Sequence, residues 1–248
     1  MKRRIPYVLL SAVLLVAWQF FGSLNQTVRL LISSPSLVVR FFADHAGDLL
    51  VATQVTLLEA VAGLCIATTF SFAMMILCFY RPSLMDFILP IMVSSQVVPL
   101  IVLAPFFIIL FGLGMSSKIA MAALMSFFPI YVSFAQGYRS ISSNIHELMH
   151  IYNVPLSLRI RHVYFPLSTS SIMSGLKVST TLAVIGAIVA EFNGAESGLG
   201  KNLFLSAKRL EPDLMMASLL LSSVLGGGLY IAINTIEKKV GSWYLQQK

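Results

Sequence analysis

Residues 146–150, His-Glu-Leu-Met-His, are the part of the chain whose residue types and spacing most directly suggest chemistry. On a helix, the two histidines of an H-E-x-x-H pattern lie on one face, where they can bind zinc while the glutamate acts as a base. The chain has only 4 His, so a match by composition alone is unexpected. One hypothesis is therefore a zinc metalloprotease that uses His146, Glu147 and His150.

The same residues lie in the longest polar and basic interruption between two apolar segments. Asn144 precedes Glu147 by three residues, which is the spacing of a helix N-cap and capping box. Asn153 can adopt the left-handed conformation that ends a helix, and Pro155 suits the first turn of the next one. We predict a helix, a tight turn and a second helix, followed by a break at Pro166.

The composition excludes an ordinary soluble protein, because 57% of the 248 residues are hydrophobic and only 11% are charged. A helix that crosses a bilayer needs about 20 mostly apolar residues. The runs that approach this length are residues 5–22, 55–79, 87–111, 119–135, 172–190 and 214–236. We therefore predict an all-α membrane protein, with residues 1–248 as a single domain, six transmembrane helices and a loop at residues 137–169.

The net charge of +7 does not indicate a nucleic-acid-binding protein, because the basic residues lie in short loops and tails. Cytoplasmic loops of membrane proteins carry an excess of Lys and Arg. With the N-terminus inside, the cytoplasmic group is Lys2, Arg3, Arg4, Arg81, Arg139, Arg159, Arg161, Lys177, Lys238, Lys239 and Lys248. The outer group is Arg29, Arg40, Lys118, Lys201, Lys208 and Arg209. This asymmetry predicts that both termini and the 137–169 loop are cytoplasmic.

Polar residues and prolines within the apolar runs are candidates for a transport pathway. A carboxylate at the depth of Glu59 is costly in a bilayer, so it either lines a pathway or makes a structural hydrogen bond. Prolines interrupt the third run, and such interruptions are tolerated where the freed backbone lines a cavity. The pathway candidates are Glu59, Gln96, Pro99 and Glu191. A channel or a secondary transporter that works alone is a further hypothesis. It would need coupling-ion or filter residues within the membrane, and these few residues give it little support.

The polar interruption also resembles the E-A-A-x-x-x-G-x9-I-x-L-P signature in the cytoplasmic loop of bacterial ATP-binding cassette (ABC) importer permeases. Glu147 is followed six residues later by Asn153, and then by Val163-Tyr164-Phe165-Pro166 at the spacing of the signature. Leu148-Met149 replace the two alanines and Asn153 replaces the glycine, while Val163 and Phe165 replace Ile and Leu. Asn and Gly both tolerate positive φ, so the turn is preserved.

Other stretches resemble the permeases that import aliphatic sulfonates, nitrate, taurine and thiamine precursors. They are Ser34-Pro35-Ser36, Val98-Pro99-Leu100, Phe111-Gly112-Leu113-Gly114, Phe128-Pro129-Ile130, Gly175-Leu176-Lys177, Ala190-Glu191-Phe192 and Ser197-Gly198-Leu199-Gly200. Their order and spacing match, and the resemblance covers about residues 5 to 245.

The resemblance implies a type I importer permease in the bacterial inner membrane, whose loop at 137–169 is a helix-turn-helix coupling loop. It implies as partners a second copy of the chain, a separate ABC ATPase dimer and an external solute-binding protein, periplasmic or lipid-anchored. ATP and Mg would belong to the ATPase, so this chain is expected to be non-catalytic, with no cofactor or metal of its own. The solute is expected to be a small organic molecule, sulfonate-like or thiamine-precursor-like.

By the same resemblance, one set of residues is expected to couple to the ATPase. These residues are Glu147, Leu148, Met149, Asn153, Pro155, Arg159, Arg161, Val163, Phe165 and Pro166.

The zinc hypothesis needs a third ligand from another segment. No carboxylate occurs between Glu147 and Glu191, and Glu191 is predicted at the opposite membrane face. His162 is the nearest further imidazole. An intramembrane zinc metalloprotease therefore remains the alternative to the permease.

Overall fold

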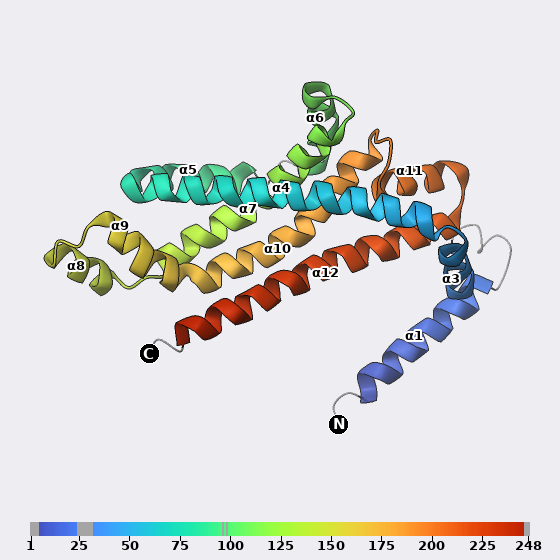
Figure 1. Cartoon of the computed structure of the whole chain (residues 1–248), viewed down its shortest axis with the longest axis horizontal. Helices are drawn as coiled ribbons and strands as arrows, with labels where there is room; N and C mark the ends of the chain where they lie inside the picture. The colour runs from blue at the N-terminus through green and yellow to red at the C-terminus, as the bar shows by residue number, and fades with distance from the viewer. Residues whose placement is uncertain (1–4, 24–31, 96, 98, 246–248) are drawn as a thin grey trace.

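The computed structural model describes residues 5–23, 32–95, 97 and 99–245, and these residues form helices without a strand among them (Figure 1). The helices are α1 (Ile5–Ser23), α3 (Pro35–Asp44), α4 (Ala46–Tyr80), α5 (Pro82–Ser95), η1 (Leu100–Leu103), α6 (Ala104–Phe111), α7 (Met115–Arg139), α8 (Ser143–Ile151), α9 (Leu156–Arg159), the π-helical turn η2 (Ile160–Tyr164), α10 (Phe165–Phe192), α11 (Leu199–Arg209) and α12 (Pro212–Leu245). The predicted all-α class is confirmed.

Within the described residues, 4 helices are long and apolar enough to cross a membrane. They are Ala46–Tyr80, Met115–Arg139, Leu156–Phe192 and Pro212–Lys239. Shorter apolar helices cover Ala12–Ser23, Pro82–Ser94 and Leu100–Phe111. The number of six transmembrane helices stays a prediction, because these shorter helices do not reach the length of a full crossing by themselves.

The third apolar run is interrupted near Pro99, as predicted, whereas Pro90 lies inside helix α5 and does not break it. Helix α5 ends at Ser95, and Pro99 has an extended backbone (φ −63°, ψ 102°) before the short helices η1 and α6. Proline has no amide hydrogen to donate, so it ends one helix and begins the next with little loss. Helix α6 projects from the bundle in Figure 1, and its Phe107 packs against Met121 and Met125 of α7 and Ala190 of α10. Gln96, a pathway candidate, lies outside the described residues.

The predicted break at Pro166 is wrong. The chain is helical without interruption from Leu156 to Phe192, passing through the π-helical turn η2. Pro166 lies in the first turn of α10, where a missing amide hydrogen is tolerated, and the wider π-helical turn precedes it. The non-helical part of the predicted 137–169 loop is consequently short, because α7 continues to Arg139.

The centre of the fold is a close contact of α7 with α10 on one side and α4 on the other. A Cβ added at Gly186 of α10 would lie 2.8 Å from the Cα of Ala122. One added at Gly63 of α4 would lie 2.5 Å from the Ala122 Cβ. Ser126 and Ser179 also donate hydrogen bonds to each other's backbone carbonyls, at 3.3 and 2.8 Å. Small residues allow helix backbones to approach closely in a membrane, where water does not drive helices together.

The two ends of this bundle carry different elements. Helices α8 and α9 lie at one end, whereas α3 and α11 lie at the other (Figure 1). Helix α1 extends away from the long helices and is joined to the start of α3, where the Trp18 indole donates to the Ser33 carbonyl at 2.9 Å. Helix α12 packs along α10, and Lys177 of α10 forms an ion pair with Glu237 of α12.

The close α7–α10 contact gives a first prediction. Gly186→Ala should destabilise the fold by about 1–3 kcal/mol, because the added methyl group meets backbone atoms that have no room to move. Gly227→Ala is the matched control, since nothing lies within 4 Å of a Cβ at that helical position. Thermal unfolding in detergent should show a lower midpoint for Gly186→Ala alone. Equal midpoints for the two variants would contradict this view of the core.

Candidate functional site

Helix α8 begins two residues earlier than the sequence predicts. Its N-cap is Ser142, which is extended (φ −57°, ψ 138°) and makes no side-chain capping bond. The Ile145 amide donates to the Ser142 carbonyl at 3.0 Å, so Asn144 is already inside the helix. The predicted Asn144 cap and its capping box with Glu147 are therefore wrong, and the Glu147 side chain is exposed.

The turn after α8 has the predicted left-handed residue. Asn153 has φ 47°, which confirms the expectation. The Val154 amide donates to the Met149 carbonyl and the Asn153 amide to the His150 carbonyl, both at 3.0 Å. This pair of bonds is the Schellman pattern, which satisfies the last carbonyls of a helix. Pro155 then precedes the first residue of α9 with φ −58° and ψ 143°.

Arg159 fixes the same turn from the other side. Its Nε donates to the Val154 carbonyl at 2.6 Å and its terminal nitrogen donates to the Met149 carbonyl at 3.2 Å. The guanidinium is thus used within the chain, where it joins α9 to the end of α8. Arg161, in contrast, has an exposed side chain.

An aromatic cluster holds α8 against the long helices. The His146 ring lies 5.5 Å from the ring of Tyr138 in α7 and 5.5 Å from that of Tyr164 in η2. Phe79 of α4 lies 5.0 Å from Tyr138 and 5.1 Å from Tyr164. Aromatic rings at these centroid distances attract each other beyond their burial. These ring contacts join α8 to α7 and η2 directly, and to α4 through Phe79.

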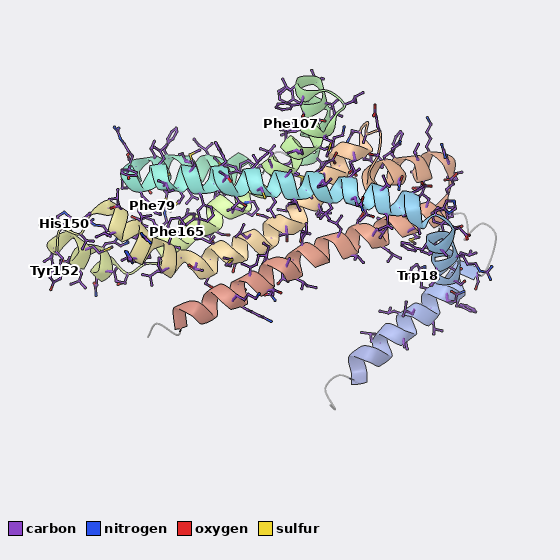
Figure 2. All side chains as sticks on the ribbon, viewed as in Figure 1. Trp18, Phe79, Phe107, His150, Tyr152 and Phe165 are labelled. Atoms are coloured by element: carbon purple, nitrogen blue, oxygen red, sulfur yellow. The ribbon has the colours of Figure 1, made fainter. Side chains whose placement is uncertain are left out.

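This packing gives His146 a role that does not involve metal. Its ring contacts two tyrosines, whereas His150 is exposed at the tip of the molecule (Figure 2). In the described part of the chain, no group of three His, Cys, Asp or Glu side chains is arranged to hold a metal ion. The third zinc ligand that the hydrolase hypothesis requires is thus absent from those residues, and nothing here favours that hypothesis.

Large apolar side chains are exposed at the tip that α8 and α9 form. The exposed fraction is 53% for Leu148, 65% for Ile151 and 76% for Tyr152, and Leu158 is also exposed. Figure 2 shows Tyr152 at this end of the molecule. Contiguous apolar surface outside the long helices is typical of a protein interaction site. We call Leu148, Ile151, Tyr152 and Leu158 the tip surface.

The expected coupling residues divide into two groups in the structure. Exposed members are Glu147, Leu148, Asn153, Pro155 and Arg161. Members that are buried or half-buried are Met149, Arg159, Val163, Phe165 and Pro166. In the second group, the Phe165 ring packs against the Phe134 ring of α7, with the ring centroids 5.2 Å apart.

Sequence analysis did not identify Ile151, Tyr152 and Leu158. The signal was present, because residues 148, 151 and 152 share one face of a helix at spacings of three and four.

At the opposite end of the bundle, the fold brings two of the pathway candidates together. Glu59 of α4 and Glu191 of α10 are buried, with 2% and 1% exposure, and their carboxyl groups adjoin. Glu191 Oε1 accepts a hydrogen bond from the Thr56 hydroxyl and Oε2 accepts one from the Gly200 amide, both at 2.6 Å. The Leu199 amide in turn donates to the Thr56 hydroxyl at 2.9 Å. Glu191 therefore holds the start of α11 against α4.

Gly198 completes this arrangement, because no other residue fits there. It has φ 117°, and a Cβ at this position would lie 2.2 Å from Glu191 Oε1. The Ser197–Gly200 stretch is thus a close-fitting cover over the Glu191 carboxyl.

Lys118 of α7 is the third buried charge at this end, with 1% exposure, and its ammonium donates to the Leu113 carbonyl. Glu59 and Lys118 both line a cavity of about 240 Å³. Sequence analysis counted Lys118 among the outer basic residues and did not identify it or Thr56 as site residues. Pro99, the remaining described candidate, is exposed at the start of η1 and does not line this cavity.

Comparison with known proteins points to membrane transport. A family profile described as "Binding-protein-dependent transport system inner membrane component" matches residues 68–240. The chain is 33% identical over 233 residues to a "probable ABC transporter permease protein" of Haemophilus influenzae, covering 94% of this chain and 95% of that one. It is 28% identical to the formylaminopyrimidine transport permease of Halalkalibacterium halodurans, covering 95% and 94%. It is also 28% identical to the riboflavin transport permease of Chloroflexus aurantiacus, covering 93% and 87%.

The Glu191 contacts give a second prediction. Glu191→Ala should lower stability by about 1–3 kcal/mol for each donor left buried without an acceptor, most directly the Gly200 amide. The turn at residues 194–198 should then be cleaved faster by protease. Glu196→Ala is the matched control, because Glu196 lies in the same turn with an exposed side chain. If both variants are cleaved at the wild-type rate, Glu191 does not hold this turn.

Proposed function

The chain belongs to the family of binding-protein-dependent transport system inner membrane components, and from this premise we propose how it works with its partners. It is a permease subunit of an ABC importer for a small solute, a multi-pass protein of the inner membrane. We propose that two copies form the membrane path, that an ABC ATPase dimer binds the tip surface and that an external binding protein delivers the solute. ATP and Mg would be bound by the ATPase.

The observation that carries this proposal is the tip itself. It exposes Leu148, Ile151 and Tyr152, yet its backbone is fixed by the Schellman turn and by Arg159. A rigid apolar surface suits a partner whose closure displaces α8, because a flexible loop would absorb the displacement. The aromatic cluster of His146, Tyr138, Tyr164 and Phe79 then connects this surface to α4, α7 and η2.

The mechanism proposed is alternating access. Closure of the ATPase dimer displaces α8, and the cluster carries the displacement into the close-packed α4, α7 and α10. The far ends of the same helices carry Glu59, Lys118 and Glu191, so the buried charges change their environment in the same step. Each conformation is favoured by different contacts, which is what a two-state coupling requires.

The proposed orientation puts both termini and the tip in the cytoplasm. Support comes from the basic residues, since eleven of the 17 Lys and Arg fall on that side. The end that carries Glu59, Lys118 and Glu191 would then be the outer end, where an external binding protein docks.

For the solute, we propose a small organic molecule of the sulfonate or thiamine-precursor kind. Relatives of the chain include permeases named for formylaminopyrimidine and for taurine. These names describe the relatives, and they indicate which classes of solute should be tested with this chain.

The docking proposal predicts that Glu147→Lys and Asn153→Pro abolish ATP-dependent uptake while the protein stays in the membrane. Lysine reverses an exposed charge on α8, and proline excludes the left-handed backbone of residue 153. Asn153→Gly is the control, because glycine adopts φ 47° without strain.

The measurement is co-purification of an ATPase subunit from the native membrane, with metal analysis of the same sample. A stoichiometric P-loop ATPase that Glu147→Lys displaces is the expected result. About one zinc per chain without an ATPase would overturn the proposal, as would normal uptake by both variants.

Arg159 and Arg161 provide a matched pair of variants. Arg159→Ala should loosen the turn, because hydrogen bonds from charged groups contribute about 1.5–3 kcal/mol each. We expect faster amide hydrogen exchange at Asn153 and Val154 and a loss of bound ATPase. Arg161→Ala removes an exposed guanidinium and should leave the exchange rates unchanged. Equal exchange rates in the two variants would show that Arg159 does not position the turn.

A further inference from the structure

Two buried carboxyl groups lie against each other at the end of the bundle opposite the tip. Glu59 and Glu191 are almost completely buried, and their side chains are hydrogen-bonded to one another. A hydrogen bond between two carboxyl groups needs a hydrogen between the oxygens, and two ionised carboxylates have none to donate. The contact therefore exists only when one of the two groups carries a proton.

The partners of Glu191 identify it as the ionised member of the pair. Its Oε1 accepts a hydrogen bond from the Thr56 hydroxyl and its Oε2 accepts one from the Gly200 amide, both at 2.6 Å. Hydrogen bonds donated to a carboxylate are stronger than those donated to a neutral acceptor, so they stabilise its charge. Glu191 is therefore the acceptor in the contact with Glu59, and Glu59 is the donor.

Glu59 has the surroundings of a neutral acid. Its Oε2 is buried, and no hydrogen-bond donor from the described residues reaches it. A buried charged oxygen without a donor is far more costly than a neutral carbonyl oxygen without one. Lys118 of α7 does not supply that donor: its ammonium is hydrogen-bonded to the Leu113 carbonyl, and among the described residues it forms no ion pair with Glu59 or Glu191.

The other charged groups at this end do not replace the proton. Glu196, in the turn after α10, lines the same cavity as Glu59 and adds a negative charge. The Lys201 ammonium of α11 is hydrogen-bonded to the Glu196 backbone carbonyl, and Asp213 of α12 accepts from the Ser33 hydroxyl. Without a proton the pair would be two adjacent buried anions, which repel each other strongly where water is excluded.

The pair lies directly under the turn that leads into α11. A Cβ at Gly198 would lie 2.2 Å from Glu191 Oε1, and the Gly200 amide is bonded to Oε2 of the same carboxyl group. The turn fits over Glu191 in one position only, so a displacement of this carboxyl would remove the support of the turn.

We propose that Glu59 and Glu191 form a proton-binding site that keeps this turn closed over the end of the bundle. With the proton bound, Glu59 donates to Glu191, which holds Thr56 and Gly200. Glu59 lines a cavity of about 240 Å³, and a proton that leaves the pair passes to water entering this cavity. Both carboxyl groups are then ionised, they repel each other and the turn is released. This role goes beyond the coupling of the permease to its partners.

Infrared spectroscopy of the full chain in lipid nanodiscs tests for the proton. The C=O stretch of a protonated carboxylic acid lies apart from the carboxylate bands and shifts in D₂O. At about pH 7, where ordinary exposed carboxyl groups are ionised, the wild type should show this band at about one carboxyl per chain. Glu59→Gln should lack the band. Asp48→Asn, which changes an exposed carboxylate on the same helix, is the matched control and should retain it.

Limited proteolysis of the turn at residues 194–198 tests what the proton does. The cleavage rate of the wild type is divided by that of Glu59→Gln at each pH, which cancels the pH dependence of the protease itself. The amide of Glu59→Gln can donate to Glu191 at every pH, so its turn should stay closed. The ratio should rise about tenfold from neutral to alkaline pH, as the wild type loses the proton. Asp48→Asn should follow the wild type.

The absence of an acid band from the wild type near neutral pH would overturn the inference, even if Glu59→Gln does not fold. A band that Glu59→Gln retains would also overturn it, as would a cleavage ratio that stays constant with pH. Neither measurement involves the ATPase or the solute, so a negative result rejects the proton site and leaves the permease function standing.

Discussion

The close approach of α7 to α4 and α10 is the constraint on which the rest of the structure depends. Ala122 of α7 meets Gly63 and Gly186 at distances that leave no room for another methyl group, and Ser126 and Ser179 bond across the same contact. In a membrane, where apolar side chains gain little by leaving lipid, small residues and interhelical hydrogen bonds are what hold helices together. Because these three helices run the length of the bundle, the same contact positions groups at both of its ends.

At the tip, local backbone chemistry and long-range packing have separate parts. The left-handed Asn153 and the Schellman bonds end α8, and Arg159 adds two hydrogen bonds to carbonyls of that turn. The rings of His146, Tyr138 and Tyr164 then decide where α8 lies relative to the long helices. The two histidines of the H-E-x-x-H pattern consequently have different surroundings: His146 packs against the protein, and His150 faces away from it.

At the other end of the bundle, hydrogen bonds from neighbouring groups offset part of the cost of burying the Glu191 carboxyl. Glu191 accepts two hydrogen bonds, and Gly198 lets the covering turn approach its carboxyl group. Glu59 and Lys118 are left with unused hydrogen-bonding capacity around a small cavity.

The sequence by itself determined the membrane class, the interruption at Pro99 and the left-handed turn at Asn153, because each follows from composition or from local backbone preference. Its resemblance to importer permeases could also be recognised from the order and spacing of short sequence motifs, and the family match confirms it. Continuous helix through Pro166 was not predictable, because a π-helical turn depends on packing around residues 160–164. Nor was the meeting of Glu59, Lys118 and Glu191, which come from three segments far apart along the chain. Only tertiary structure decides such contacts, since the spacing of residues within one helix says nothing about which neighbouring helix it faces.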